Sequence, residues 1–219
     1  MGKKYYLTGA NGKIYESDTR GQLGGRHGRG ERNIYGLMNC PEALRALAAP
    51  THASYEAHRV FFANEKTALS AGYRPCGTCL KSRFLKWREN PAEYIKSVQD
   101  GRHPGAREHK MDLQRKYFDF VVSGTKRVEL GLFDEKRRGI MVGDLITFSC
   151  DGESVKVRVT DLILRDTFEE IIEEKPMSKL AGESVTKDEL LSDLAEFYSM
   201  ERQREYGVVG IEFEVMRND

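Results

Sequence analysis

Apolar and polar residues follow different patterns in the two halves of the chain. In the first half, alanine and leucine recur at helical spacing behind a proline, which predicts a helix over 41–49. The stretch "HRVFFA" predicts a strand. The stretch "NEKTALSAG" predicts a helix capped by Asn64 and stopped at Gly72. A last helix is predicted over residues 80–99.

In the second half, apolar and polar residues alternate as they do in half-buried strands. A short helix is expected over 115–124, and two acidic helices over 168–175 and 187–198. The expected strands occupy 109–114, 125–133, 143–150, 153–165 and 205–216. Short strands with helices at the margins predict a small mixed barrel rather than a parallel sheet.

Two segments have the composition of connections. Residues 21–33, "GQLGGRHGRGERN", are rich in glycine and arginine, which predicts a loop or an irregular hairpin. The stretch "GRHPGA" predicts a linker at 101–106. We therefore expect an N-terminal module over 1–100 and a second domain over 107–219.

The overall charge of +1 conceals an asymmetry between these halves. Residues 1–104 carry 17 Lys and Arg against 9 Asp and Glu, whereas residues 105–219 carry 18 against 25. A basic half joined to an acidic half indicates modules with separate partners, although surface charge also drifts between domains without function. No apolar run approaches the length of a membrane span and no signal peptide is evident, so we expect a cytoplasmic protein with no membrane partner.

The stretch "RPCGTC" places Cys76 and Cys79 at a spacing that suits a shared metal ion. Cys40 is the natural third ligand, and His58 or His52 the natural fourth, since zinc prefers four thiolate and imidazole ligands. A redox pair is the weaker alternative, because no thioredoxin-like strand and helix surround the cysteines. Cys150 is expected to be a small core residue.

The stretch "HRVFFANEKTALSAGYRPCGTC" resembles the N-terminal zinc-binding domain of the Ada DNA-repair proteins, and the likeness runs from about residue 34 to 88. The resemblance implies a zinc ion held by Cys40, Cys76 and Cys79. In that family a further cysteine, which accepts a methyl group from DNA phosphate, stands where this chain has Gly36. Thiolate transfer is therefore not expected here, and we expect His58 to complete a structural site.

Basic and aromatic residues of this half are candidates for contact with a phosphate backbone. A solvated helix face and a polar loop explain the same residues without function. The candidates are Arg26, Arg29, Arg32, Arg83, Lys86 and Trp87.

The stretch "HKMDLQRKYFDFVVSGTKRVELGLFDEKRRGIMVGDLITF" resembles the ASCH domain, a relative of the PUA fold. The likeness covers about residues 107–216. It implies a compact barrel with a cleft beside the turn between helix and strand, and an association with RNA or modified nucleotides. The expected fold class is therefore α+β, a small zinc-binding α/β module followed by a PUA-like mixed β-barrel with flanking helices.

Residues near this turn are candidates for a ligand site. Lys126 and Glu129 converge only if a turn or bulge breaks strand alternation between them. A lysine beside a carboxylate can exchange protons with a substrate. His109 and Arg127 are further candidate ligand contacts, and Glu183 is a candidate lid residue. The structural alternatives are a rim ion pair for Glu129 and a tie between strands for His109.

One ASCH branch, small amidohydrolases that deacetylate N4-acetylcytidine, resembles this arrangement more closely. Their Lys and Glu correspond to Lys126 and Glu183, but their Thr falls on Glu129 and their Arg on Gly131. The hydroxyl nucleophile and a cleft cation are thus expected to be missing. We expect a zinc-stabilised nucleic-acid-associated protein that prefers RNA to DNA. The alternative is a hydrolase of acylated nucleosides or RNA that uses Lys126, Glu129 and Glu183.

Overall fold

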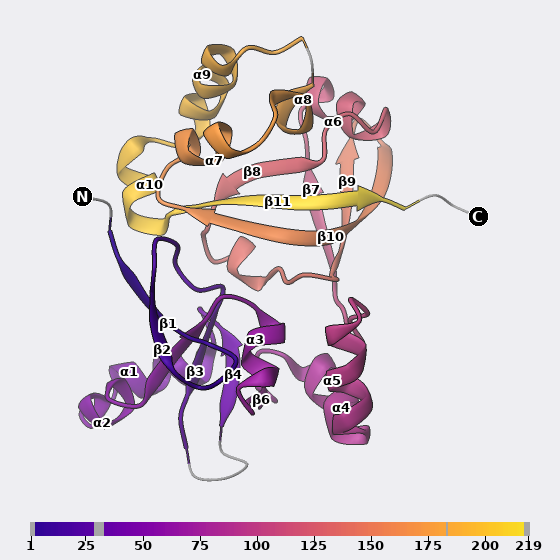
Figure 1. Ribbon diagram of the computed structural model, residues 1–219. Coiled ribbons are helices and arrows are strands. Elements are labelled where there is room, and N and C mark those ends of the chain that lie inside the picture. The colour runs from indigo at the N-terminus through magenta and orange to yellow at the C-terminus, as the bar shows by residue number, and fades with distance from the viewer. Residues whose placement is uncertain (1–2, 29–32, 183, 217–219) are drawn as a thin grey trace. The chain divides into compact units, whose positions relative to one another are not determined.

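The computed structural model describes residues 3–28, 33–182 and 184–216 and forms two compact units, Met1–Ala106 and Arg107–Asp219 (Figure 1). Each unit combines helices with its own sheet, so the predicted α+β class is confirmed. Among the residues described, no helix has both the length and the apolar character that a membrane span requires.

The N-terminal unit contains a hairpin and a four-stranded sheet. The hairpin joins β1 (Tyr5–Thr8) to β2 (Ile14–Ser17). In the sheet the strand order is β5-β3-β4-β6, with only the β4–β6 pair parallel. Its strands are β3 (Leu23–Arg26), β4 (Ile34–Leu37), β5 (Arg59–Phe62) and β6 (Arg74–Pro75). The glycine-rich segment thus contributes β3, and the hairpin alternative describes it better than a loop.

Five helices accompany this sheet within the described part of the unit. They are α1 (Pro41–Ala48), α2 (His52–Glu56), α3 (Glu65–Ser70), α4 (Lys81–Glu89) and α5 (Pro91–Gln99). The predicted helix over 80–99 is wrong as one element. Asn90 adopts an extended backbone, accepts a hydrogen bond from Glu93 N, and precedes Pro91, so it ends α4 and begins α5. Asn64 caps α3 as predicted.

The C-terminal unit is built on a five-stranded sheet ordered β7-β9-β10-β11-β8. Only the β7–β9 pair is parallel. The strands are β7 (Glu108–Asp112), β8 (Val128–Leu132), β9 (Leu145–Cys150), β10 (Glu153–Arg165) and β11 (Val208–Val215). The β10–β11 register shifts between Val159 and Asp161, and such a bulge increases the bend of a sheet. β7 and β8 stand at opposite edges, so the predicted barrel is a curled half-barrel.

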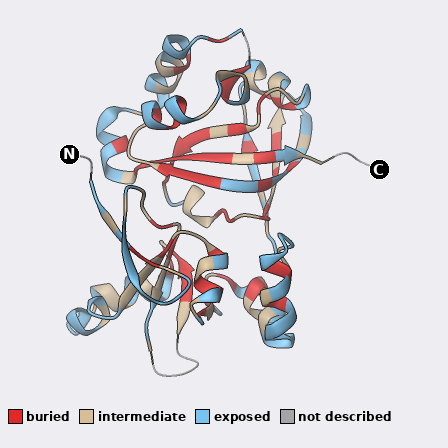
Figure 2. Cartoon of the chain, in the orientation of Figure 1, coloured by how far each residue is buried: buried red, intermediate tan, exposed pale blue. Residues whose placement is uncertain are grey.

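Helices cover one face of this half-barrel (Figure 1). They are α6 (Arg115–Val122), α7 (Phe168–Glu174), α8 (Met177–Ala181), α9 (Lys187–Phe197) and α10 (Met200–Tyr206), and a 3-10 turn η2 spans Arg137–Gly139. Thr167 and Thr186 form capping boxes that begin α7 and α9, the two predicted acidic helices. The hydrophobic core lies beneath them, where the strands are buried (Figure 2). Its members include Val128, Leu130, Leu132, Phe168, Ile171, Leu180, Leu190 and Val208.

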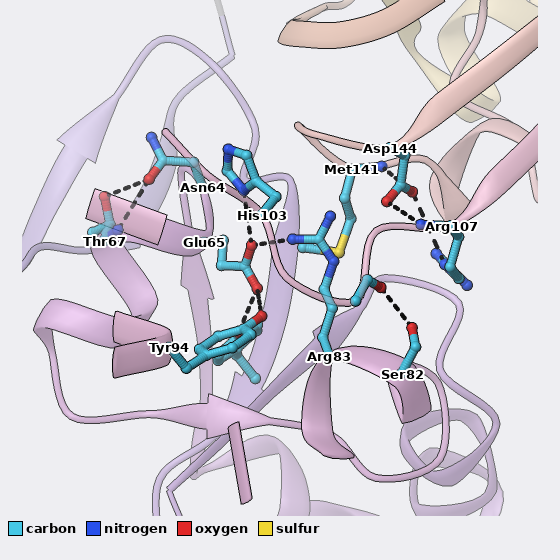
Figure 3. Close-up of polar contacts among 12 residues, drawn as sticks. Asn64, Glu65, Thr67, Ser82, Arg83, Tyr94, His103, Arg107, Met141 and Asp144 are labelled. Atoms are coloured by element: carbon cyan, nitrogen blue, oxygen red, sulfur yellow. Dashed lines mark hydrogen bonds and ion pairs between the residues drawn. The ribbon is translucent and has the colours of Figure 1, made fainter. Parts of the chain in front are cut away.

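A buried carboxylate holds the elements of the N-terminal unit together (Figure 3). Glu65 is 5% exposed and accepts hydrogen bonds from Tyr35 Oη at 2.6 Å and Tyr94 Oη at 2.8 Å. It also forms a short ion pair with Arg83, and His103 Nδ1 lies 3.6 Å away. Arg83, predicted to face nucleic acid, is 0% exposed, so that prediction is wrong.

The same network sets the ionisation of Glu65. Burial alone raises the pKa of this carboxyl, but Arg83, the nearby His103 ring and the hydrogen bonds from Tyr35 and Tyr94 bring its pKa below the ordinary value. The stabilisation is therefore fully present above about pH 4.3, the ordinary glutamate pKa, and is lost as pH falls through the lower folded value.

The Glu65→Gln variant is expected to lose about 3 kcal/mol of the free energy of unfolding at neutral pH, because it leaves the Arg83 charge buried without its partner. Trp87 is the single tryptophan of the chain and lies in α4, so its fluorescence during urea unfolding reports on this unit. The gap between wild type and variant should narrow below about pH 4.3.

The matched control is Glu89→Gln, which breaks the exposed Lys86–Glu89 pair of the same helix and should leave the unfolding curve unchanged. Equal stability of Glu65→Gln and wild type would show that the network does not hold the unit together.

Candidate functional site

The C-terminal unit contains a cavity of about 190 Å³ between α6, β8, η2 and α9. Its walls combine aromatic and aliphatic side chains with a few charged groups, a composition typical of ligand pockets. The polar and aromatic lining residues are Asp112, Gln114, Tyr117, Lys126, Glu129, Arg137, Asp193, Phe197 and Tyr198.

The structure brings Lys126 and Glu129 together. Their charged atoms lie 3.3 Å apart, with the side chains 3% and 15% exposed. Strand alternation does not separate them, because β8 begins only at Val128 and Lys126 lies in the turn before it. That turn is closed by the Lys126 N–H, which donates to Phe120 O, and by Gly124 at φ 79°. Sequence reasoning required such a turn, and the structure contains it.

Lys126 is already extensively bonded at the floor of the cavity. Its ammonium donates to Val128 O at 2.8 Å and to Leu180 O, and it lies 5.2 Å from the centre of the Tyr117 ring. With Glu129 as its third partner, the three donor hydrogens of Lys126 are matched by three acceptors. The lysine therefore positions the Glu129 carboxylate at the cavity wall.

Arg137 supplies a cation that the sequence comparison expected to be missing. A Cβ atom at Gly131 would lie only 2.3 Å from Arg137 Nε, so the absence of a side chain at 131 makes room for the guanidinium. Arg137 donates to Asp134 Oδ2 at 3.1 Å and to Tyr198 Oη at 3.0 Å. Its Nε is buried without a hydrogen-bond partner among the described residues. The expectation of a lost cation is wrong, because the charge comes from a different element.

Sequence reasoning missed Tyr117 and Asp193. The Tyr117 hydroxyl donates to Asp193 Oδ2 at 2.5 Å, and this hydrogen bond lowers the pKa of Asp193. Burial, with Asp193 as the second cause, raises the pKa of Tyr117. A signal was present, since Asp193 interrupts the apolar face that Leu190, Leu194 and Phe197 form on α9.

The other predicted residues of this unit lie elsewhere or are not described. His109 Nε2 lies 2.9 Å from Asp144 Oδ2, which favours the structural alternative of a tie between strand and loop. Arg127 is half-buried, and its guanidinium lies beside Gly124, away from the cavity lining. Glu183 lies outside the described residues.

The N-terminal unit brings Cys40, Cys76 and Cys79 together, with their sulfur atoms all within 4.8 Å of one another. The Cys40 and Cys76 sulfurs are 3.8 Å apart, and a tetrahedral zinc ion with bonds of about 2.3 Å holds two sulfurs at about that distance. Backbone N–H groups of Leu37 and Thr78 point at the Cys79 and Cys76 sulfurs, each at 3.4 Å. Hydrogen bonds from the neighbouring thiols hold the pKa of Cys76 well below its usual range. The donor set fits a metal that prefers thiolates.

Neither histidine predicted as a fourth ligand joins this cluster in the described residues. His58 is exposed, and its Nδ1 lies 2.8 Å from Ser54 O. His52 is also exposed, with Nδ1 3.2 Å from Ala49 O. The Nδ1 atom of each ring therefore lies beside a backbone carbonyl, in α2 for His58 and just before α2 for His52. Neither ring joins the sulfur atoms. The half-buried Cys150 belongs to the other unit.

The predicted phosphate contacts are dispersed. Arg26 is exposed, with its guanidinium 5.9 Å from the centre of the Tyr55 ring. Lys86 pairs with Glu89 at 3.0 Å, and Trp87 stacks on Phe84. Arg29 and Arg32 lie outside the described residues.

Comparison with known proteins identifies the C-terminal half. Residues 111–217 match the ASCH domain. The crystal structure of hypothetical protein PH0355 is 34% identical, covers 50% of this chain and 99% of that chain, and has a TM-score of 0.46. The solution NMR structure of protein PF0455 from Pyrococcus furiosus is 34% identical, covers 51% and 99%, and has a TM-score of 0.43.

No curated protein matches the chain, and no Ada-type family match falls on the N-terminal half. The C-terminal unit therefore belongs to the ASCH domain family, which is associated with RNA.

The close approach of Gly131 and Arg137 predicts strong coupling between the two positions. Gly131→Ala should lower the free energy of unfolding by about 1–3 kcal/mol, because the new methyl group must displace the guanidinium. In an Arg137→Ala background the same change should cost less than half as much. Urea unfolding followed by circular dichroism measures both.

Arg158→Ala is the control background, because Arg158 lies on β10 outside the cavity. There the cost of Gly131→Ala should equal its cost in wild type. An unchanged cost in the Arg137→Ala background would contradict the placement of this arginine.

Proposed function

We propose that this protein binds single-stranded RNA and takes one unpaired or modified base into the cavity of its ASCH domain. The observation that carries the proposal is the convergence of Glu129 and Arg137 on one small aromatic-lined cavity. Single-stranded RNA is recognised by aromatic stacking and by hydrogen bonds to base edges. A volume of about 190 Å³ lies below the roughly 300–1,000 Å³ of pockets for drug-sized ligands, which suits one planar ring system.

The polar groups of the cavity indicate which bases suit it. The Glu129 carboxylate accepts hydrogen bonds, and the unpartnered Arg137 Nε donates one. Cytosine and guanine each present both an amino donor and a carbonyl acceptor. Uracil lacks the amino group and adenine lacks the carbonyl. We therefore expect a base of the cytosine or guanine type, in its ordinary or modified form.

The two units contribute different kinds of contact in this proposal. The N-terminal half carries the surplus of positive charge, and its exposed cations bind phosphates without regard to sequence. The ASCH cavity distinguishes the base. RNA is preferred to DNA because ASCH domains are associated with RNA.

Hydrolysis of an acylated nucleoside or of RNA is a second candidate, and the 3.3 Å Lys126–Glu129 pair favours it. Glu129 stands where the similar amidohydrolases carry a hydroxyl nucleophile. The carboxylate would act instead as a general base toward water, and Lys126 would hold it in place. Glu129 takes a proton from water, and the resulting hydroxide attacks the acyl carbon or phosphorus. The bond from that atom to the amine or ribose oxygen then breaks, and the leaving group takes the proton from Glu129.

Filter binding with short RNA oligonucleotides tests the leading proposal. Cytidine-containing oligonucleotides should bind more tightly than uridine-containing ones, and binding should weaken as salt rises. Arg137→Gln should weaken cytidine binding by about tenfold, because one hydrogen bond to the base is lost. Arg158→Gln is the matched control, since it removes an exposed arginine of the same unit from outside the cavity.

Absence of binding at about 50 mM salt would contradict the proposal, because nonspecific affinity is strongest at low salt. Equal affinity of wild type and Arg137→Gln would remove the cavity from the binding site. Turnover of the oligonucleotide or of an acylated cytidine that disappears in Glu129→Gln would establish the hydrolase instead.

We also propose that Cys40, Cys76 and Cys79 hold a zinc ion that stabilises the N-terminal unit. Purified protein is expected to contain one equivalent of zinc by elemental analysis. Cys76→Ser should lose it, whereas His58→Ala and Cys150→Ser should retain it. Chelation should destabilise the unit as followed by Trp87 fluorescence, because metal binding and folding are coupled. Full metal content in Cys76→Ser would contradict the assignment.

A further inference from the structure

The cysteine cluster packs against Gly36 on one side and borders a cavity on another. A Cβ atom at Gly36 would lie 2.7 Å from Cys79 Sγ, 3.2 Å from Cys76 Cβ and 3.9 Å from Cys40 Cβ. Position 36 therefore faces all three cysteines, and the Cys79 sulfur occupies the space that a side chain at 36 would need. Gly36 is absent from the glycines with positive φ, so the backbone conformation alone does not require glycine here.

A cavity of about 500 Å³ lies beside the cysteine cluster and gives access to it. Gly24 of β3 is the cross-strand partner of Gly36 in β4, so the two residues share one face of the sheet and leave it bare. Cys40, Cys76 and Gly36 line the cavity together with apolar groups such as Met38 and Phe84. The volume falls in the range of about 300–1,000 Å³ that small-molecule sites occupy.

The far wall of this cavity is cationic. Arg26, Arg59 and Arg74 line it. Arg59 lies 4.9 Å from the centre of the Phe61 ring, and its Nε is buried without a hydrogen-bond partner in the described part of the chain. Glu42 is the carboxylate of the lining, and Arg45 engages it at 2.9 Å. The arginines beside the cysteines are thus held by aromatic rings and suit an anionic ligand.

We propose that the fourth ligand of the zinc site comes from outside the chain, as the thiolate of a small thiol that also carries a carboxylate. The inference rests on the proposed zinc site. Three protein ligands and one open position are the arrangement of zinc sites that take an exogenous ligand. Soft thiolate donors match the three-sulfur shell, the apolar wall suits the alkyl chain, and Arg59 suits the carboxylate. On binding, the thiol proton is released to solvent.

The full-length protein loaded with cobalt provides the test, because the visible absorption of cobalt reports its ligands. The protein is prepared with a phosphine reductant, and its metal content is measured first. Titration with 3-mercaptopropionate should change the absorption and reach saturation. The neutral thiol 2-mercaptoethanol should bind about tenfold more weakly, since it lacks the charged hydrogen bond. Propionate alone should leave the spectrum unchanged.

Arg59→Gln separates the carboxylate contact from metal coordination. The variant should bind 3-mercaptopropionate about tenfold more weakly and 2-mercaptoethanol with unchanged affinity, because only the former presents a carboxylate. An equal loss for both thiols would overturn the role of Arg59 in the proposal.

Two substitutions at Gly36 test the open position itself. Gly36→Cys should show a four-sulfur cobalt spectrum without added thiol and no response to 3-mercaptopropionate. Gly36→Ala puts a methyl group against the Cys79 sulfur without adding a ligand, so it should show neither the four-sulfur spectrum nor a response. A wild-type response in Gly36→Ala would overturn the proposal. If these variants fail to fold, the wild-type titration and Arg59→Gln decide.

The metal measurement distinguishes the two levels of inference. One equivalent of metal with no spectral response to either thiol would overturn the exogenous ligand and leave the zinc site standing. Absence of bound metal would overturn both.

Discussion

The N-terminal unit depends on one buried carboxylate. Glu65, at the start of α3, receives hydrogen bonds from Tyr35 and Tyr94 and pairs with Arg83, so it joins β4, α4 and α5. This network is also connected to the cysteine cluster through the backbone, because Tyr35 O accepts a hydrogen bond from Cys76 N at 2.8 Å. The Glu65 carboxylate accepts from both tyrosines and pairs with Arg83, and such a buried network adds order to the unit. The positions of the cysteines follow from that order.

Two glycines show that a missing side chain has different consequences in different surroundings. At Gly131 the space is taken by Arg137, which restores a cation to the ASCH cavity from another element. At Gly36 the Cys79 sulfur takes the space, but among the described residues no fourth ligand joins the three cysteines, and both predicted histidines lie elsewhere. A residue-by-residue comparison with the similar families treats each glycine as the loss of a functional side chain. The three-dimensional neighbours decide whether the loss is compensated or leaves room for a ligand.

Local signals were sufficient for much of the fold. Asn64 and the acidic helices after Thr167 and Thr186 were predictable because each depends on residues within one turn. Cys40, Cys76 and Cys79 followed from spacing. The turn before β8 was recognised as a requirement for the Lys126–Glu129 pair. Arg83 was misassigned because its partner Glu65 lies 18 residues away and no local pattern reports that contact. The position of Arg137 and the cavity beside Cys40 and Cys76 depend on packing between elements, which the periodicity of the sequence does not report.

The distribution of charge is consistent with different kinds of ligand contact in the two units. The surplus of +8 in residues 1–104 is not a uniform phosphate track, since Arg83 is neutralised by Glu65 and Lys86 pairs with Glu89. Arg26 and Arg59 instead lie over the ring of Tyr55 near the cysteines. Residues 105–219 carry a balance of −7, so the ASCH unit gains little from long-range attraction to phosphates. In the proposed RNA complex its contribution would therefore come from short-range contacts with a base. A carboxylate such as Glu129 suits that role, because it accepts hydrogen bonds from the amino group of a base.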